Sequence, residues 1–242
     1  MATENLRYCF QDINLFFIFL FSFIPVLIWF KFLISEDTHK EPIISIFLAF
    51  VLGIIATILS YYSELSLSLF YSIDSIPYFL FSAFIEEFFK FFLVFIFIIP
   101  TKNFHFLIDA MIYLGITGLG FAFTENFVLK CNILITNLES NPYGLIILYS
   151  FLRFLGANFL HLLASVLIGF GYSITLQTRR VFPFLFSFSM ASLLHFVYNI
   201  FIIKEYLIIY VLPILWSVFF IVLNEFKVLK ELDGRIRKYS SN

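Results

Sequence analysis

Three ionisable side chains lie within about one helical turn, near the middle of a long apolar stretch that spans residues 76–96. They are Glu86, Glu87 and Lys90, and their neighbours are mostly phenylalanine, leucine, isoleucine and valine. A charged side chain at the centre of a membrane helix costs about 2.5–3.5 kcal/mol on insertion scales, against a typical folding stability of about 5–15 kcal/mol. The fold must therefore pair or use these groups, and we expect function near them.

Composition places the whole chain in a membrane. The 242 residues are 62% hydrophobic and 13% charged, with a mean hydropathy of +1.00, whereas a soluble domain is about half apolar and about a quarter charged. Because a lipid-exposed backbone must satisfy its hydrogen bonds within each segment, we predict an all-α, polytopic helical bundle. The net charge of −1 identifies no partner, and we expect a lipid bilayer around the chain and no nucleic-acid binding.

Seven apolar segments are long enough to cross about 30 Å of hydrocarbon. We place these transmembrane helices at Ile13–Ile34, Ile43–Tyr61, Pro77–Ile99, Leu107–Leu129, Leu145–Leu176, Val181–Ile203 and Tyr206–Asn224. The fifth segment is overlong, so we expect it to tilt or to break near Gly156. The stretch Glu64–Ser75 is apolar but interrupted by serine and aspartate, and it could add a re-entrant or interfacial eighth segment.

No internal repeat or linker divides the chain, so we predict a single transmembrane domain over residues 1–242. A motif-bearing core covers residues 77–203, and a basic tail follows over residues 225–242. The two cysteines, Cys9 and Cys131, can form a disulfide only if both face the same oxidising compartment.

Basic residues predict the orientation of the bundle. With the amino terminus outside and the carboxy terminus cytoplasmic, three basic residues lie outside and two lie within the membrane. The cytoplasmic set is Lys31, Lys40, Lys102, Arg179, Arg180, Lys227, Lys230, Arg235, Arg237 and Lys238; the outside set is Arg7, Lys130 and Lys204. This bias follows the positive-inside rule and supports that orientation.

Further polar residues recur in the fourth, fifth and sixth segments. They are Glu125 and Asn126, then Arg153 and His161, then His195 and Asn199. Gly118, Ala122 and Glu125 share one helical face, and small residues allow helices to approach closely, so Glu125 should point into the bundle. The fifth segment repeats small or polar residues at a spacing of four: Ala157, His161, Ser165 and Gly169.

These polar groups are expected at overlapping depths, because each helical residue rises 1.5 Å along the axis. Glu86, Glu87, His161 and His195 fall within roughly 5 Å of the membrane midplane on this count. Glu125, Asn126 and Asn199 fall roughly 10 Å nearer the outside. Their shared depth on consecutive helices favours a common site over separate helix–helix contacts.

Two neighbouring carboxyl groups in a low dielectric cannot both ionise cheaply, while Lys90 favours ionisation of one of them. Such a pair can supply a base and an acid for the activation of water. Imidazoles and carboxamides can then stabilise a developing oxyanion. The same residue types could instead hold Zn²⁺, although the sequence has no HExxH pattern that would require it.

The ordered clusters resemble the PrsW family of polytopic intramembrane proteases, which is related to the CAAX prenyl protease and Abi group. The resemblance covers about residues 77–203, half the chain. It rests on Glu86-Glu87-x-x-Lys90, Asp109-Ala110-x-x-Tyr113, Gly120-Phe121-Ala122-x-x-Glu125-Asn126, the pair Arg153 and His161, and His195-x-x-x-Asn199. A single EExxK pattern is weak evidence, whereas the ordered set within predicted helices is specific.

The resemblance implies an endopeptidase of the bacterial inner membrane that cuts a single-span membrane protein, such as an anti-sigma factor, near its extracytoplasmic side. It implies that Glu86 or Glu87 is the base and that three further residues polarise the substrate carbonyl: His161, His195 and Asn199. Supporting roles fall to Lys90, Glu125, Asn126 and Arg153. Asp109 is expected to be structural.

Glu125 departs from the prenyl protease relatives, which have a histidine at this point of the second motif. This leaves three roles open for Glu125: a metal ligand, a second acid, or a partner of Arg153. We expect water activation by glutamate without a metal, with zinc as the alternative. A zinc ion would be held by Glu87, Glu125, His161 and His195.

Two other classes of function remain open from the sequence. In a proton- or ion-coupled transporter or ligand-binding membrane protein, buried Glu, His and Lys form a pathway, and such proteins often show two related halves with broken helices. We see no such halves. A catalytically inactive relative that binds single-span partners would keep the fold, although intact glutamates and histidines argue against it. The oligomeric state is not predicted.

Overall fold

The computed structural model describes residues 12–136, 142–204 and 209–240. The described residues form helices, turns and short connections, and contain no β-strand. The helices are α2 (Asp12–Glu36), α3 (Ile43–Leu67), α4 (Ile76–Phe97), α5 (Leu107–Thr136), α6 (Pro142–Leu155), α7 (Ala157–Thr178), α8 (Phe182–Ile203) and α9 (Val211–Ser240). The prediction of an all-α bundle is confirmed.

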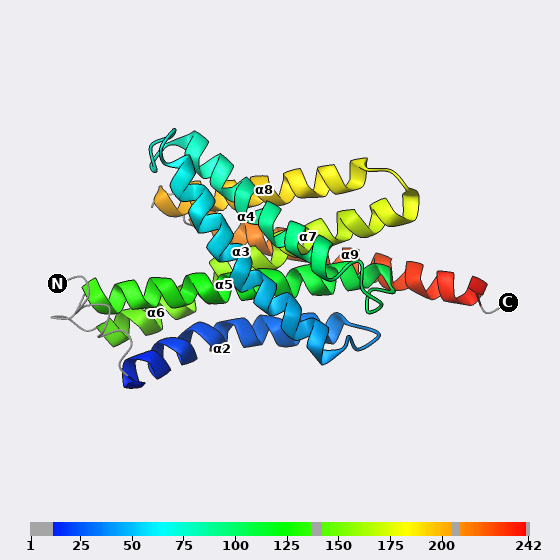
Figure 1. Cartoon of the computed structure of the whole chain (residues 1–242), viewed down its shortest axis with the longest axis horizontal. Helices are drawn as coiled ribbons and strands as arrows, with labels where there is room; N and C mark the ends of the chain where they lie inside the picture. The colour runs from blue at the N-terminus through cyan, green and yellow to red at the C-terminus, as the bar shows by residue number, and fades with distance from the viewer. Residues whose placement is uncertain (1–11, 137–141, 205–208, 241–242) are drawn as a thin grey trace.

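Helix α5 lies in the middle of the bundle (Figure 1). Helices α2, α5, α7 and α8 run roughly along the long axis of the molecule, and α3 and α4 cross it obliquely (Figure 1). The residues from Ile108 to Ala122 are all buried, as expected for a helix that is apolar on every side. We call the end of the bundle where α2 begins the N-side and the opposite end, where α9 finishes, the C-side.

Six stretches of the described chain are long and apolar enough to cross a membrane: Asn14–Glu36, Ile43–Leu67, Leu107–Thr136, Pro142–Thr178, Phe182–Ile203 and Val211–Arg235. Helix α4 is not among them because its 22 residues include Glu86, Glu87 and Lys90. All three side chains are buried, so the rest of the helix can still face lipid. Helix α4 is the seventh segment of the predicted bundle, with its charge turned inward.

Small residues allow the helices around α5 to pack closely. A Cβ atom at Gly53 of α3 would collide with the Thr117 backbone oxygen of α5, and one at Gly120 would collide with the Phe50 oxygen. On the other side of α5, a Cβ atom at Gly118 would lie 2.5 Å from the His161 oxygen of α7. The small-residue faces predicted on α5 and α7 therefore bring Glu125 and His161 onto neighbouring helices.

The overlong fifth segment is divided at Gly156, where α6 ends and α7 begins. The stretch Glu64–Ser75 adds no further helix: residues 64–67 complete α3, and residues 68–75 form the turn into α4. The eighth segment considered from the sequence is therefore absent at this position. Serine and aspartate favour turns because their side chains can hydrogen-bond the local backbone, which explains this outcome.

The basic tail is not separate from the bundle, because α9 continues without a break to Ser240. The Asp233 carboxylate accepts hydrogen bonds from the backbone N–H groups of Leu107 (3.0 Å) and Ile108 (3.2 Å), at the start of α5. Asp109 accepts two more, 2.8 Å each, from the two residues before α5. Asp109 has the structural role expected of it, since carboxylates are favourable at a helix amino terminus.

The question of whether Cys9 and Cys131 are paired falls partly outside the described residues, because these begin at residue 12. Arg7, one of the three basic residues assigned to the outside, also lies outside them.

Candidate active site

The polar residues of α4, α5, α7 and α8 meet at a cavity of about 290 Å³ in the N-side half of the bundle. Its lining comprises Tyr78, Phe79, Ser82, Glu86, Glu125, Arg153, Ala157, Leu160, His161, His195, Tyr198, Asn199, Ile202 and Ile203. The cavity therefore joins residues from every predicted cluster except the Asp109 pattern. Its lining is polar on the side of the carboxylates and imidazoles, and apolar where α8 ends.

The two adjacent glutamates have different surroundings. Glu86 lines the cavity, and its Oε2 has no hydrogen-bond partner among the described residues. Glu87 is fully buried, and its Oε1 accepts from Lys90 Nζ at 2.7 Å and lies 2.8 Å from His195 Nδ1. Neighbouring helical residues point about 100° apart, so one carboxylate faces the cavity while the other binds the surrounding helices.

The hydrogen bonds assign proton positions to the two imidazoles. An ammonium group can only donate, so Lys90 Nζ donates to His161 Nδ1 at 3.0 Å. His161 Nε2 then carries the proton and donates to Glu125 Oε2 at 2.7 Å. For His195, Nδ1 donates to the Glu87 carboxylate, which leaves the Nε2 lone pair toward Glu86 Oε2, 3.6 Å away.

Lys90 is a buried cation with three partners. Besides Glu87 and His161, its Nζ lies 4.3 Å from the centre of the Phe121 ring, where a cation is attracted to the aromatic face. Lys90 and Glu87 are both 0% exposed. The pair balances the two buried charges within the protein, although Glu87 Oε2 has no hydrogen-bond partner among the described residues.

Glu125 is a partner of Arg153, one of the three roles left open by the sequence. Arg153 donates to Glu125 Oε2 at 2.8 Å and also hydrogen-bonds Asn126. Asn126 donates to Asn158 Oδ1 at 2.8 Å. This chain joins α5, α6 and α7 beside the cavity and fixes the carboxylate that holds His161.

Within the described residues, three potential metal ligands come close together: Glu86, His161 and His195 have ligand atoms within 4.8 Å of one another. Two imidazoles and a carboxylate are a donor set that suits zinc. The buried Glu86 Oε2, which has no hydrogen-bond partner among the described residues, is also available as a ligand for a cation. These residues therefore fit a metal ion, although an ion at His161 Nε2 would replace the hydrogen bond to Glu125.

The metal-ligand set expected from the sequence stays a prediction. The trio shares His161 and His195 with that set, but it contains Glu86 in place of Glu87 and does not include Glu125. Glu87 Oε1 is already shared between Lys90 and His195. A carboxylate bound to the other nitrogen of a histidine is a common support for a metal-binding imidazole. Glu125, also expected as a ligand, contacts His161 from the side of the cavity.

Asn199 lines the cavity as expected, one turn beyond His195. Sequence reasoning missed Ser82, Glu64 and Tyr198. The Ser82 hydroxyl donates to Glu64 Oε1 of α3 at 2.7 Å, and Ser82 lies one turn before Glu86 on the same face of α4. The spacing of four residues between Ser82 and Glu86 could have indicated that Ser82 belongs to the site. Tyr198 gives no such signal, because it is one of 13 tyrosines in a chain that also has 38 phenylalanines.

A cluster of carboxylates and imidazoles around a polar cavity, enclosed by apolar helices, defines a membrane-embedded hydrolytic site. Comparison with known proteins gives the same class. The family model for PrsW family intramembrane metalloproteases matches residues 41–224. Protease PrsW of Oceanobacillus iheyensis is 30% identical over 186 residues, which cover 75% of this chain and 80% of the relative.

The chain belongs to the PrsW family, and it is an integral membrane peptidase. The resemblance inferred from the sequence motifs is confirmed. No solved structure matches the chain.

Proposed function

We propose that this protein cuts a single-span membrane protein, such as an anti-sigma factor, near its extracytoplasmic side. The observation that carries the proposal is the cavity of about 290 Å³, which reaches the start of α4 and the end of α8 on the N-side. The distribution of Lys and Arg supports an extracytoplasmic N-side in a bacterial inner membrane. A substrate helix that unwinds near this side would bring a peptide bond to the depth of Glu86.

Glu86 is assigned the central step, because its carboxylate faces the cavity and Oε2 has no hydrogen-bond partner in the described part of the chain. It accepts a proton from water or holds the ion that activates water, and a carboxyl group so protonated can return the proton to the leaving amine. Glu87 and Lys90 position His195 and His161. We assign to Asn199 the role of polarising the substrate carbonyl, as the family resemblance implies.

The family description favours a metal over the metal-free reaction expected from the sequence. Glu86, His161 and His195 would hold the ion. When bound, an ion such as zinc supplies Lewis acidity that lowers the proton affinity of water and polarises a peptide carbonyl. With an ion at His161 Nε2, the Lys90 contact to Nδ1 would keep the imidazole in position. Glu125, freed from that nitrogen, would stay paired with Arg153.

Co-expression with candidate single-span membrane proteins tests the proposed function. We expect cleaved fragments, detected by immunoblotting with tags on both ends, that end near the extracytoplasmic boundary of the substrate helix. The fragments should be absent with the Glu86→Gln variant at equal expression. Fragments that persist with this variant, or cuts that lie on the cytoplasmic side, would contradict the assignment.

Metal analysis tests the ligand set. Protein purified without chelator should contain about one metal ion per chain, as expected for a three-residue site with one open position. His195→Ala should lower this content strongly, because it removes one of three ligands. His105→Ala is the matched control, since His105 lies in the turn before α5 and away from the cavity. Full cleavage activity after complete removal of the metal would instead support the glutamate-only reaction.

A further inference from the structure

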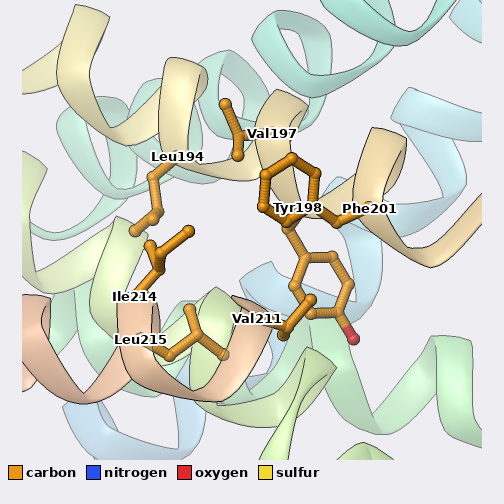
Figure 2. A pocket seen from close by; sticks show the side chains of 7 residues that line it. All are labelled: Leu194, Val197, Tyr198, Phe201, Val211, Ile214 and Leu215. Carbon is orange, nitrogen blue, oxygen red and sulfur yellow. The ribbon is translucent and has the colours of Figure 1, made fainter. Parts of the chain in front are cut away.

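Tyr198 lines two neighbouring cavities. It lines the cavity that holds Glu86, and it also lines a small apolar pocket between α8 and α9 (Figure 2). The other residues of the pocket are Leu194, Val197, Phe201, Val211, Ile214 and Leu215. The ring of Tyr198 therefore separates the polar cavity from apolar side chains of α9.

The hydroxyl group of Tyr198 points away from the apolar pocket (Figure 2). It lies close to Gly156, where a Cβ atom would be only 2.8 Å from the hydroxyl oxygen. It is also within electrostatic reach of Arg153 and Glu125, two residues of the cavity lining. No hydrogen bond joins it to the described residues. Tyr198 thus brings to the cavity wall a hydroxyl donor that has no partner in the described part of the chain.

The reaction needs such a donor, because attack on a peptide carbonyl moves negative charge onto its oxygen. The imidazoles are poor candidates as arranged: both nitrogens of His161 are hydrogen-bonded, and His195 lies between Glu87 and Glu86. Arg153 is engaged by Glu125 and Asn126. Among the α8 residues that line the cavity, the remaining polar donors are Tyr198 and Asn199.

We propose that the Tyr198 hydroxyl donates a hydrogen bond to the carbonyl oxygen of the scissile peptide bond, beside Asn199. This inference rests on the proposed peptidase reaction at the same cavity. The hydroxyl keeps its proton throughout, so its contribution is charge stabilisation and not proton transfer. The hydroxyl lies over Gly156, where the absence of a Cβ atom leaves room for it before substrate binds.

Tyr198→Phe keeps the ring and removes only the donor. We expect kcat for cleavage of a single-span substrate to fall by about 10²-fold, the effect of losing one oxyanion donor, with KM and thermal stability close to those of the unaltered protein. Tyr172→Phe is the matched control and should leave kcat unchanged. Tyr172 is a buried tyrosine that packs on Phe91 and Phe184 in the C-side half, away from the cavity.

Gly156→Ala provides a second, independent variant, since the added methyl group would displace the hydroxyl. It should lower kcat alone but cause little further loss when combined with Tyr198→Phe. An unchanged kcat for Tyr198→Phe, or a raised KM alone, would overturn the role of Tyr198. If Glu86→Gln is inactive in the same assay, the proposed peptidase function would still stand. Cleavage that survives Glu86→Gln would overturn both.

Discussion

Glu86→Gln should lower kcat for peptide cleavage by about 10²–10⁴-fold, the range for loss of a positioned acid–base group. Glutamine keeps the size of the side chain but cannot accept the proton, and it is a poor ligand for a metal ion. Because Glu86 Oε2 has no hydrogen-bond partner among the described residues, the substitution breaks no hydrogen bond of that oxygen and alters only its 3.6 Å contact with His195 Nε2. The rate should be measured on protein in lipid nanodiscs with a purified single-span substrate, together with the thermal unfolding temperature.

Glu225→Gln is the matched control for this experiment. Glu225 is also a buried glutamate on an apolar helix, and its Oε2 likewise lacks a hydrogen-bond partner in the described chain. It lies at the middle of α9 and does not line the cavity. Equal loss of activity in the two variants would mean that burial of a carboxyl group, and not the position of Glu86, controls cleavage.

Lys90→Met should have the largest effect on stability, lowering the free energy of unfolding by about 3–5 kcal/mol. The substitution leaves the Glu87 carboxylate buried without its cation, and it removes the donor to His161 Nδ1. Reversible unfolding in mixed detergent micelles would measure the change. The reason for so large an effect is that neither Lys90 nor Glu87 is exposed.

Two comparisons isolate the cause of the Lys90 effect. Combining Lys90→Met with Glu87→Gln should recover part of the lost stability, because no unpaired charge remains. Lys230→Met is the exposed comparison. It breaks the Lys230–Glu36 pair, which has the same 2.7 Å separation but side chains that are 32% and 22% exposed. This substitution should lower the free energy of unfolding by only about 0–1 kcal/mol. Similar losses for Lys90→Met and Lys230→Met would show that burial does not set the strength of the pair.

Much of the fold could be predicted because apolar length and buried charge are local signals. Segments of about 20 apolar residues mark the spans, and Gly156 marks the division between α6 and α7. The tail was predicted less well: the expected helix ends at Asn224, whereas α9 reaches Ser240. The contact between Asp233 and the start of α5 joins residues more than 100 positions apart, so no local pattern reveals it.

The site could be predicted as a set of residues but not as a geometry. The motifs identify which helices carry polar groups, and the cavity lining contains Glu86, His161, His195 and Asn199 as expected. They cannot separate Glu86 from Glu87, because the difference depends on where α7 and α8 lie around α4. Tyr198 had no sequence signal, since its role depends on the hydroxyl lying over Gly156 at the start of α7. The catalytic roles stay predictions until the variants are measured.

The Asp233 carboxylate limits which insertions and deletions the last part of α9 can accept. It holds the first amides of α5, and it belongs to a continuous helix. One residue inserted between Asn224 and Asp233 would rotate that carboxylate by about 100° and move it about 1.5 Å along the axis. The spacing of this segment is therefore as constrained as that of a buried helix, even though its sequence is rich in charge.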